Sequence, residues 1–465
     1  LEAVAGIEAC GKGVATDWNI SDDGLTYTFK LRNNSHWAMF SGHKAVLGEN
    51  YEDTFDITVK AEDFKFGIER TLSEQTGSAD APLFSAVKSI STPDDFTIVF
   101  NLSYADDNFL YALTNPGAMP CDEEFFNLTN GKYGLDAKYL LCNGPFHVSK
   151  WTEKTSVKLA KNNEYNGESS VSPSSVTFYI NNDDSEVADK MNSVTYDVAF
   201  LSSSQFSSIE NKKDLNSVAV QNVTYSFIFN QNDNNYRNKN MRLAFCRSCD
   251  TSSLFDSQSD ISKADGIVPP SCKIGGEDYR NGNAAELLSY DETLAKKNFN
   301  DALLELGSSS VETTILCTEQ YEPFVKQMVQ KLQKTLGVKF VSTVKVVSES
   351  DLEAAVNDGN YSVAFYPFKA KSSFAGEIIE GFDQNNIFGY ESDVLSQKIR
   401  NIKNNSGSLE GERSAVADAE NYLVSEAVIM PVFYENSYFV TSKKTSGIYF
   451  YSSADNVCFI NAKKS

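Results

Sequence analysis

The sequence predicts an α/β protein with mixed sheets, built from more than one domain. Two segments share one pattern, in which a short polar helix and a turn lead into an apolar strand: SEVADKMNSVTYDVAFL (185–201) and SDLEAAVNDGNYSVAFYP (350–367). An apolar strand that follows a helix is typical of a sheet covered by helices. The chain has 465 residues, 41% of them hydrophobic, and a single core rarely grows that large, so we expect two or three domains.

The first regular elements are expected to form an antiparallel hairpin. Trp18 leads to an acidic turn at 22–24, and polar and apolar residues alternate over 26–32. A tight turn followed by such alternation predicts a half-buried strand. The segment FTIVFNL (96–102) predicts another strand of this region.

A helix is expected between these strands, over 61–72. Its first turn carries acidic residues, which favour the positive end of the helix dipole. Phe64, Ile68 and Leu72 recur every four residues and give the helix one apolar face. The preceding segment 38–58 is rich in Gly, Asp and Asn and is expected to be a long loop.

Strands and helices alternate through the rest of the chain. Strands are predicted at 145–149, 155–161, 338–347, 429–434 and 437–441, and helices at 292–306, 321–336, 391–403 and 410–425; an apolar segment at 311–317 follows the first of these helices. Gly307 and Gly337 directly follow two of the helices, where glycine is the usual C-cap.

The charge balance excludes several classes of partner. Lys and Arg number 41 and Asp and Glu number 63, which gives a net charge of −22. An acidic surface repels phosphate backbones and anionic lipids, so no nucleic-acid partner is expected. No apolar run approaches the length of about 18 residues that a membrane span needs. The box IEACG (7–11) is similar to a lipoprotein cleavage site, but no basic segment precedes it, so we expect a mature or trimmed chain.

The eight cysteines are compatible with disulfides but do not require them. Cys121 and Cys142 flank a short segment that a disulfide could close. Cys246 and Cys249 lie within a predicted helix, whereas a redox CxxC would open a helix after a strand. We expect these two to be partly buried thiols or to pair with Cys272.

No catalytic or metal-binding motif is present, so we expect neither an enzyme nor a cofactor. The sequence holds no GxSxG, HExxH, P-loop or GxGxxG pattern. His36 and His43 could bind a metal with Glu49 or Asp53, but we interpret them as solvated loop residues. His147, which lies in a predicted strand, is interpreted as structural.

An ordered series of segments resembles the bacterial extracellular solute-binding proteins of family 5, the peptide/nickel class of receptors of ABC importers. These segments are WNISDDGLTYTFKLR (18–32), VKAEDFKFGIERTL (59–72), FTIVFNLS (96–103), NGPFHVSKW (143–151), FNQND (229–233), MRLAFCRSCD (241–250), GIVPP (266–270), YDETLAKKNFNDALLELG (290–307) and MPVFY (430–434). Each segment is a loose match, but their order along the chain is specific.

The resemblance implies a two-lobe, periplasmic-binding-protein-like clamshell with an extra domain. Domain II would span 1–142, domain I would span 143–227 and 438–465, and domain III would span 228–437. The lobes would hinge near 228 and 437 and close on a ligand.

The resemblance also implies a non-catalytic receptor that delivers its ligand to a membrane permease. A short peptide is the ligand we expect first. The alternatives are a saccharide, a metal chelate or an anionic small molecule, and a sensor that serves a signalling receptor; a hydrolase is the least favoured. We expect a monomer that is either periplasmic or on the cell surface, lipid-anchored through a removed N-terminal segment.

Candidate ligand residues follow from the rule that ligands lie beyond the carboxyl ends of strands in open α/β sheets. The loops that leave the two repeated units are 201–207 and 366–374. We expect ligand contacts from aromatic walls and polar groups on these loops and near the first crossover; the candidates are Tyr225, Phe365, Tyr366, Phe368, Ser202, Ser203 and Gln205.

One departure from the family concerns the charge of the ligand. Its peptide binders place an aspartate, which pairs with the peptide amine, in the stretch equivalent to 361–374. Here Phe368 stands at the position of the family's Trp, and Lys369 and Lys371 occupy the region of the carboxylate. A lysine cannot pair with an ammonium group. These lysines would instead bind a ligand carboxylate or be solvated loop residues.

Overall fold

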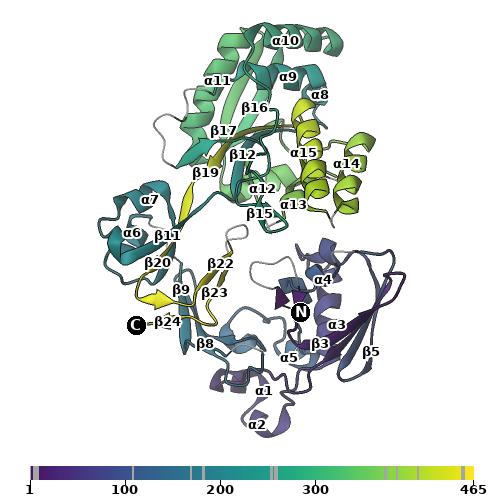
Figure 1. Ribbon diagram of the computed structural model, residues 1–465, viewed down its shortest axis with the longest axis vertical. Coiled ribbons are helices and arrows are strands. Elements are labelled where there is room, and N and C mark those ends of the chain that lie inside the picture. Colours follow the sequence, from purple (N-terminus) through teal and green to yellow (C-terminus); the bar gives the residue numbers. More distant parts are fainter. Residues whose placement is uncertain are drawn as a thin grey trace. The chain divides into compact units, whose positions relative to one another are not determined.

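The structure is a computed structural model that describes the chain except residues 1, 4–9, 107–108, 168–169, 181–183, 252–254, 256–259, 371–373, 384–385, 406–407 and 452–455. Helices and strands are mixed along the whole chain, which confirms the predicted class (Figure 1). The chain forms two compact units. Unit 1 comprises Leu1–Glu186, Lys443–Tyr449 and Val457–Ser465, and unit 2 comprises Val187–Ser442 and Phe450–Asn456.

The main sheet of unit 1 has four antiparallel strands in the order β3-β4-β6-β5. They are β3 (Ala15–Ile20), β4 (Thr26–Leu31), β5 (Val87–Asp94) and β6 (Thr97–Leu102). The predicted hairpin is confirmed: β3 pairs with β4, and Gly24 takes the positive φ of 68° that the turn requires.

Helix α3 (Ala61–Leu72) has the predicted bounds and packs on this sheet. Ala61 and Ile68 are buried with the strand residues Phe29 and Phe100, and Phe64 and Leu72 pack against them. The amphipathic spacing in the sequence therefore identified the buried face of the helix.

Asp63 in the first turn of α3 should make the stability of the protein depend on pH. Its carboxylate accepts a hydrogen bond from the backbone N–H of Lys60 at 2.8 Å, yet burial raises its pKa from 3.8 to about 7, with a further contribution from Asp122. The folded state then binds a proton that the unfolded chain releases, so the stability contributed by Asp63 falls as the pH rises from about 4 to about 7. Asp63→Asn removes this loss and should gain about 2 kcal/mol over the wild type at pH 8, but little at pH 4.

Urea unfolding of both proteins between pH 4 and pH 8 measures this difference. Glu62→Gln is the control with the opposite sign, because hydrogen bonds from Lys65 and Thr92 lower the pKa of Glu62. The stabilisation that Glu62 contributes is lost as the pH falls, so this variant should differ from the wild type most at neutral pH. A difference between Asp63→Asn and the wild type that does not change with pH would contradict the prediction.

The segment 38–58 is not the long loop that the sequence predicted. It contains the helices η1 (Ser41–His43), α1 (Lys44–Leu47) and α2 (Tyr51–Thr54). The reason is a small separate core in which Trp37 and Phe125 are buried, with scattered apolar residues of the segment, such as Leu47, packed against it. Such isolated apolar residues show no regular period in the sequence.

The remaining elements of unit 1 include a second antiparallel sheet, in the order β7-β8-β9. Its strands are β7 (Phe146–Thr152), β8 (Ser156–Lys161) and β9 (Ser175–Tyr179). The unit also contains the short helices η2 (Ala81–Phe84), α4 (Phe109–Ala112), η3 (Pro116–Ala118), α5 (Glu123–Leu128) and η4 (Ala137–Tyr139). The described strands that form two-stranded sheets, in either unit, are β1 (Glu2–Ala3), β2 (Cys10–Gly11), β14 (Lys273–Ile274), β15 (Glu277–Asp278), β21 (Thr445–Ser446), β22 (Tyr449–Tyr451), β23 (Asn456–Cys458) and β24 (Lys463–Lys464).

Unit 2 is built on a six-stranded mixed sheet in the order β13-β19-β12-β18-β16-β17. Its strands are β12 (Val223–Phe229), β13 (Ile261–Lys263), β16 (Val311–Cys317), β17 (Phe340–Val346), β18 (Val363–Lys369) and β19 (Ile429–Glu435). The pairs β16–β17 and β16–β18 are parallel, and the others are antiparallel.

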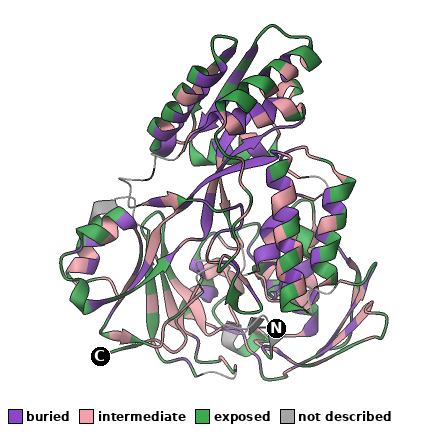
Figure 2. Ribbon diagram, turned by 45° about the horizontal axis from the view of Figure 1, so that its top comes forward, coloured by how far each residue is buried: buried purple, intermediate pink, exposed green. Residues whose placement is uncertain are grey.

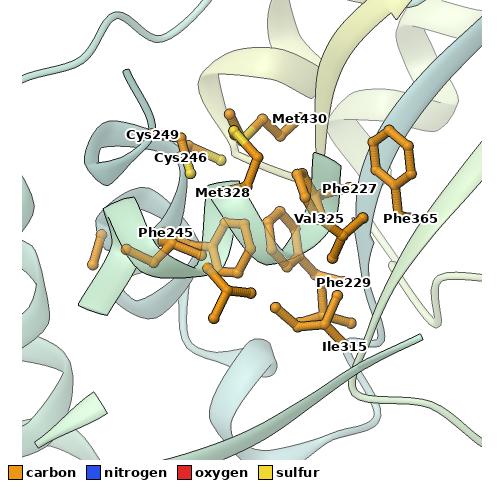
Figure 3. Close-up of a cluster of buried hydrophobic side chains, with 14 of the residues drawn as sticks. Phe227, Phe229, Phe245, Cys246, Cys249, Ile315, Val325, Met328, Phe365 and Met430 are labelled. Atoms are coloured by element: carbon orange, nitrogen blue, oxygen red, sulfur yellow. The ribbon is translucent and has the colours of Figure 1, made fainter. Parts of the chain in front are cut away.

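Helices cover both faces of this sheet, as the apolar strands predicted. One face packs against α9 (Lys239–Ser248), α10 (Glu292–Leu306) and α11 (Glu322–Leu336), and the other against α12 (Glu349–Asn357), α13 (Ala375–Glu380), α14 (Asp393–Asn404) and α15 (Leu409–Ser425). Figure 2 shows the central strands as buried between these helices. Figure 3 shows the first face, where Phe227 and Phe229 lie against Phe245 with ring centroids 5.3 and 5.1 Å apart. The bounds of α10 agree with the prediction, and the apolar segment 311–317 forms β16.

The two repeated helix–strand units belong to different sheets. The first runs from α6 (Asp184–Asn192) to β10 (Val198–Ser202), and the second from α12 to β18. β18 is a central strand of its sheet, as predicted, and Val363, Ala364 and Phe365 at its start are buried. β10 is instead an edge strand of a three-stranded sheet, β10-β20-β11, which also contains β11 (Leu215–Val220) and β20 (Ser437–Ser442).

The chain crosses between these two sheets at two places. β11 ends at Val220 and β12 begins at Val223, so the first crossover is 221–222. β19 ends at Glu435 and β20 begins at Ser437, so the second is Asn436. The second crossover lies beside the predicted position, but the first lies before the predicted 228 because β12 pairs with β18 and β19 over its whole length.

The disulfide predicted between Cys121 and Cys142 is absent, since both thiols are free. Cys246 lies in α9, and Cys249 follows the end of the helix; both are buried and free, so they are not the partly buried thiols expected. Pairing with Cys272 is also excluded, because Cys272 belongs to the core on the opposite face of the sheet. Burial raises the pKa of Cys246 to about 12, which keeps its thiol unreactive.

Among the described helices, none combines the length and the apolar character that crossing a membrane demands. The other short helices of the chain are α7 (Ser203–Ser208), η5 (Lys212–Asp214), α8 (Asn234–Arg237) and η6 (Glu319–Tyr321).

Candidate functional site

The two crossover segments of unit 2 are joined by a polar network. The side-chain amide of Gln221 donates to Oδ1 of Asn436 at 2.7 Å and to Oγ of Ser262 at 2.8 Å. The hydroxyl of Ser262 donates to the same Asn436 oxygen at 3.2 Å. Residues 215 positions apart in the chain are thus held side by side where the chain changes sheets.

Both repeated units end beside this network. Lys369 at the end of β18 pairs with Val223, directly after the first crossover. Ser202 at the end of β10 pairs with Ser437, directly after the second crossover. Ligands of open α/β sheets bind at such strand ends. The structure therefore brings the ends of both predicted units to the crossovers.

The first face of the large sheet ends in a cluster of aromatic rings. The ring of Tyr225 lies 4.4 Å from that of Tyr321, 5.5 Å from Phe365 and 5.1 Å from Phe433. Tyr225 is half-buried, but Phe365 is only 1% exposed and belongs to the core. The prediction that Phe365 forms a ligand wall is therefore wrong, because alternate residues of β18 point to opposite faces and Phe365 points into the core.

A carboxylate joins this aromatic cluster. The hydroxyl of Tyr321 donates to Oε1 of Glu435 at 3.0 Å and accepts from the side-chain amide of Gln320 at 3.3 Å. Tyr321 is also hydrogen-bonded to Tyr225. Burial and the charge of Glu435 raise the pKa of both tyrosines, so both hydroxyls stay protonated.

The sequence analysis missed Glu435 and Tyr321, although a signal for both was present. Glu435 directly follows the predicted strand 429–434, and Tyr321 closely follows the apolar segment 311–317. The rule that ligands lie beyond the carboxyl ends of strands holds for these segments as well as for the two repeated units.

The opposite face of the sheet ends in a stack of three phenylalanines. The rings of Phe382 and Phe388 lie 4.5 Å apart and nearly parallel, and Phe368 lies 5.9 and 5.8 Å from them. Tyr366 meets Phe368 edge-on at 5.5 Å. Phe382 and Phe388 are buried, whereas Tyr366 and Phe368 are half-buried at the end of β18. Tyr366 and Phe368 thus remain candidates for an apolar wall.

The polar candidates after β10 are engaged in local structure. Oγ of Ser202 accepts from the backbone N–H of Gln205 at 3.2 Å, and Oε1 of Gln205 accepts from that of Ser202 at 2.7 Å. This capping box begins α7. Ser203 is buried, and the backbone N–H of Ser204 donates to the carboxylate of Asp260. Ser202 and Gln205 are therefore engaged in capping α7, and Ser203 is buried at the start of that helix.

The two lysine candidates have different outcomes. Lys369 is exposed at the end of β18. Lys371 lies outside the described residues. Their pairing with a ligand carboxylate stays a prediction.

Two of the histidines contact a neighbouring polar group. His43 is buried rather than solvated, with its Nε2 atom 3.2 Å from the carbonyl oxygen of Leu140. Burial lowers its pKa to about 4, so the ring is neutral at pH 7. The Nδ1 atom of His36 lies 3.6 Å from the Oε2 atom of Glu164. In the described part of the chain, no group of three or more His, Cys, Asp or Glu residues could hold a metal ion.

A buried ion pair holds the loop that contains the GIVPP segment. The guanidinium group of Arg280 is bound to the carboxylate of Glu420, and their side chains are only 8% and 1% exposed. The same carboxylate accepts from the backbone N–H groups of Ile267 at 2.7 Å and Val268 at 2.9 Å. Glu420 thereby ties this loop to α15, on the face of the sheet that carries Phe368.

Known proteins share this fold and sequence pattern. The dipeptide-binding protein DppE of Bacillus subtilis (strain 168) is 23% identical over 458 residues, which cover 94% of this chain and 80% of that protein. Listeria monocytogenes OppA, solved bound to peptide, is 21% identical with a TM-score of 0.76 over 99% of this chain and 91% of that one. The binding protein AgaA from A. tumefaciens R10, solved with agropinic acid, is 16% identical with a TM-score of 0.75 over 99% and 91%.

The two solved structures show that the chain has the two-lobe, periplasmic-binding-protein-like fold. This is the fold that the resemblance implied. Residues 11–388, most of the chain, match the family described as bacterial extracellular solute-binding proteins, family 5. This chain is therefore a member of the bacterial extracellular solute-binding proteins, family 5.

Proposed function

We propose that this chain captures a short peptide and delivers it to the membrane permease of an ABC importer. The observation that carries the proposal is the family match over residues 11–388, together with a relative named a dipeptide-binding protein that aligns along 94% of the chain. The strand ends at the crossovers offer aromatic rings and hydrogen-bonding groups, a combination that suits peptides with varied side chains. Closure would occur about 221–222 and Asn436, the two places where the chain changes sheets.

The remaining properties follow from the family and are part of the proposal. The protein is a monomer outside the cytoplasm, either periplasmic or attached to the cell surface by a lipid anchor. It performs no chemistry on its ligand, and it uses no metal or other cofactor.

A second candidate ligand is an anionic small molecule. Lys369 is exposed at the end of β18, and AgaA, which shares the fold, was solved with agropinic acid. A signalling role, in which the loaded receptor meets a sensor, would use the same ligand site.

The test is isothermal titration with a library of random pentapeptides, and in parallel with a saccharide panel, nickel chelates and small organic acids. We expect saturable heat from the peptides, with dissociation constants in the micromolar range or below. Mass spectrometry of the retained members would then identify the preferred sequences. Binding of a saccharide, chelate or acid together with no heat from any peptide would overturn the proposal.

A further inference from the structure

The end of β19 places a carboxylate beside aromatic rings at the second crossover. Glu435 is the last residue of β19, pairs with Ile261 of β13, and is followed directly by the crossover residue Asn436. It is half-buried, and the hydroxyl of Tyr321 donates to its Oε1 atom. The Glu435 carboxylate is therefore oriented by a hydrogen bond within the protein.

The rings around this carboxylate form one continuous group. Side chains two positions apart in a strand share a face, so Glu435 lies on the same face as Phe433. The rings of Tyr225 and Tyr321 lie 5.1 and 5.5 Å from that of Phe433 and 4.4 Å from each other. A carboxylate next to aromatic faces is the environment that binds ammonium groups, through charged hydrogen bonds and cation–π attraction.

The Tyr225 hydroxyl lies in the field of two carboxylates. The charged groups that act on the Tyr225 hydroxyl are the carboxylates of Glu435 and Glu349. On the neighbouring strand, Lys263 is exposed and pairs with Phe433, while Ile261 pairs with Glu435. Lys263 shares the face of Phe433, because paired residues on neighbouring strands point to the same side, but solvent screens its exposed charge. The two carboxylates therefore favour a cationic ligand group at the Tyr225 hydroxyl.

We propose that Glu435, with Tyr225 and Tyr321, forms the subsite that binds the free α-ammonium group of the peptide. This inference rests on the proposed function. It places the recognition of the amine on β19, outside the segment 361–374 in which the sequence suggested that it had been lost. Lys369 then stands on a different strand as the candidate partner for the peptide's carboxylate.

The test compares two probes on the wild type and on Glu435→Gln. The probes are a random pentapeptide library with free amino termini and the same library with N-acetylated termini. Glutamine keeps an acceptor for the Tyr321 hydroxyl but removes the charge. Glu312→Gln is the matched control, because Glu312 is exposed on β16 of the same sheet. Thermal unfolding of each variant verifies that it is folded.

We expect Glu435→Gln to weaken binding of the free-amine library about tenfold or more, the size of a charge-assisted hydrogen bond. Binding of the acetylated library should not change, and Glu312→Gln should behave as the wild type. The wild-type affinity for free amines should also fall as the pH rises past about 8, where an α-amine loses its proton, and Glu435→Gln should lose this dependence.

Failure of the subsite and failure of the proposed function give different results. If Glu435→Gln binds the free-amine library as tightly as the wild type, the subsite is wrong and the peptide receptor stands. If the wild type binds neither library, the proposed function fails, and the subsite fails with it.

Discussion

Replacing Glu420 with glutamine is expected to lower the free energy of unfolding by about 3–5 kcal/mol, the cost of leaving a buried charge without its partner. The guanidinium group of Arg280 would remain, with a side chain that is only 8% exposed. Glutamine is nearly isosteric and still offers one oxygen. The variant therefore isolates the loss of charge from the loss of volume.

The size of this effect follows from the number of donors that meet one carboxylate. Oε1 accepts from the backbone N–H groups of Ile267 and Val268 and from Arg280. Oε2 accepts from the hydroxyl of Tyr279 at 3.1 Å and from Arg280 at 2.9 Å. A glutamine amide presents its own N–H₂ group to at least one of these donors, so a buried donor loses its acceptor.

Urea unfolding at neutral pH measures the loss. Glu410→Gln is the control, since Glu410 is exposed in the first turn of the same helix α15. A double variant, Arg280→Met with Glu420→Leu, should not recover the loss, because the backbone N–H groups of Ile267 and Val268 and the hydroxyl of Tyr279 then stay buried without an acceptor. A Glu420→Gln protein as stable as the Glu410→Gln control would show that the ion pair contributes little.

The sequence predicted the elements whose boundaries are set by local signals. Helix α10 begins after Asp291, whose side chain accepts from the N–H of Leu294, and ends at Gly307, which adopts the left-handed conformation. Both features act within a few residues, so they are visible in the sequence. The bounds of α3 were predicted for the same reason.

The features that depend on distant pairing were not predictable. The first crossover precedes Val223 because β12 pairs with β18 and β19, which follow it by more than a hundred residues in the chain. The bond between Tyr321 and Glu435 joins residues 114 positions apart. The sequence shows two strand ends there, but not that they meet.

Among the candidate site residues, the prediction failed where it ignored the alternation of side chains along a strand. Phe365 and Phe368 were both expected to be ligand walls. Phe365 faces the core under Tyr225, and Phe368 lies on the opposite face at the end of the strand. Counting in steps of two from the buried Val363 would have separated them.

Alanine substitutions of Phe365 and Phe368 should therefore give opposite patterns of stability and binding. Phe365→Ala opens a cavity among Tyr225, Phe227, Phe324 and Phe433, and should lower the free energy of unfolding by about 3–5 kcal/mol. Phe368→Ala removes a half-buried ring, so its stability cost should be about 1–2 kcal/mol. Of the two variants, Phe368→Ala should weaken peptide binding more, with a loss of about tenfold in affinity for the pentapeptide library.

Urea unfolding and titration of the same two variants test this contrast. Phe388→Ala is the matched control for Phe368→Ala, since Phe388 is in the same stack but is buried, and should lose stability without a specific loss of affinity in the folded fraction. The reasoning depends on exposure: a ring that reaches solvent at a strand end can be shared with a ligand, whereas a core ring is already fully packed. If Phe368→Ala binds the library as the wild type does, then Phe368 completes the core and the aromatic wall of the ligand site must lie on the face that carries Tyr225.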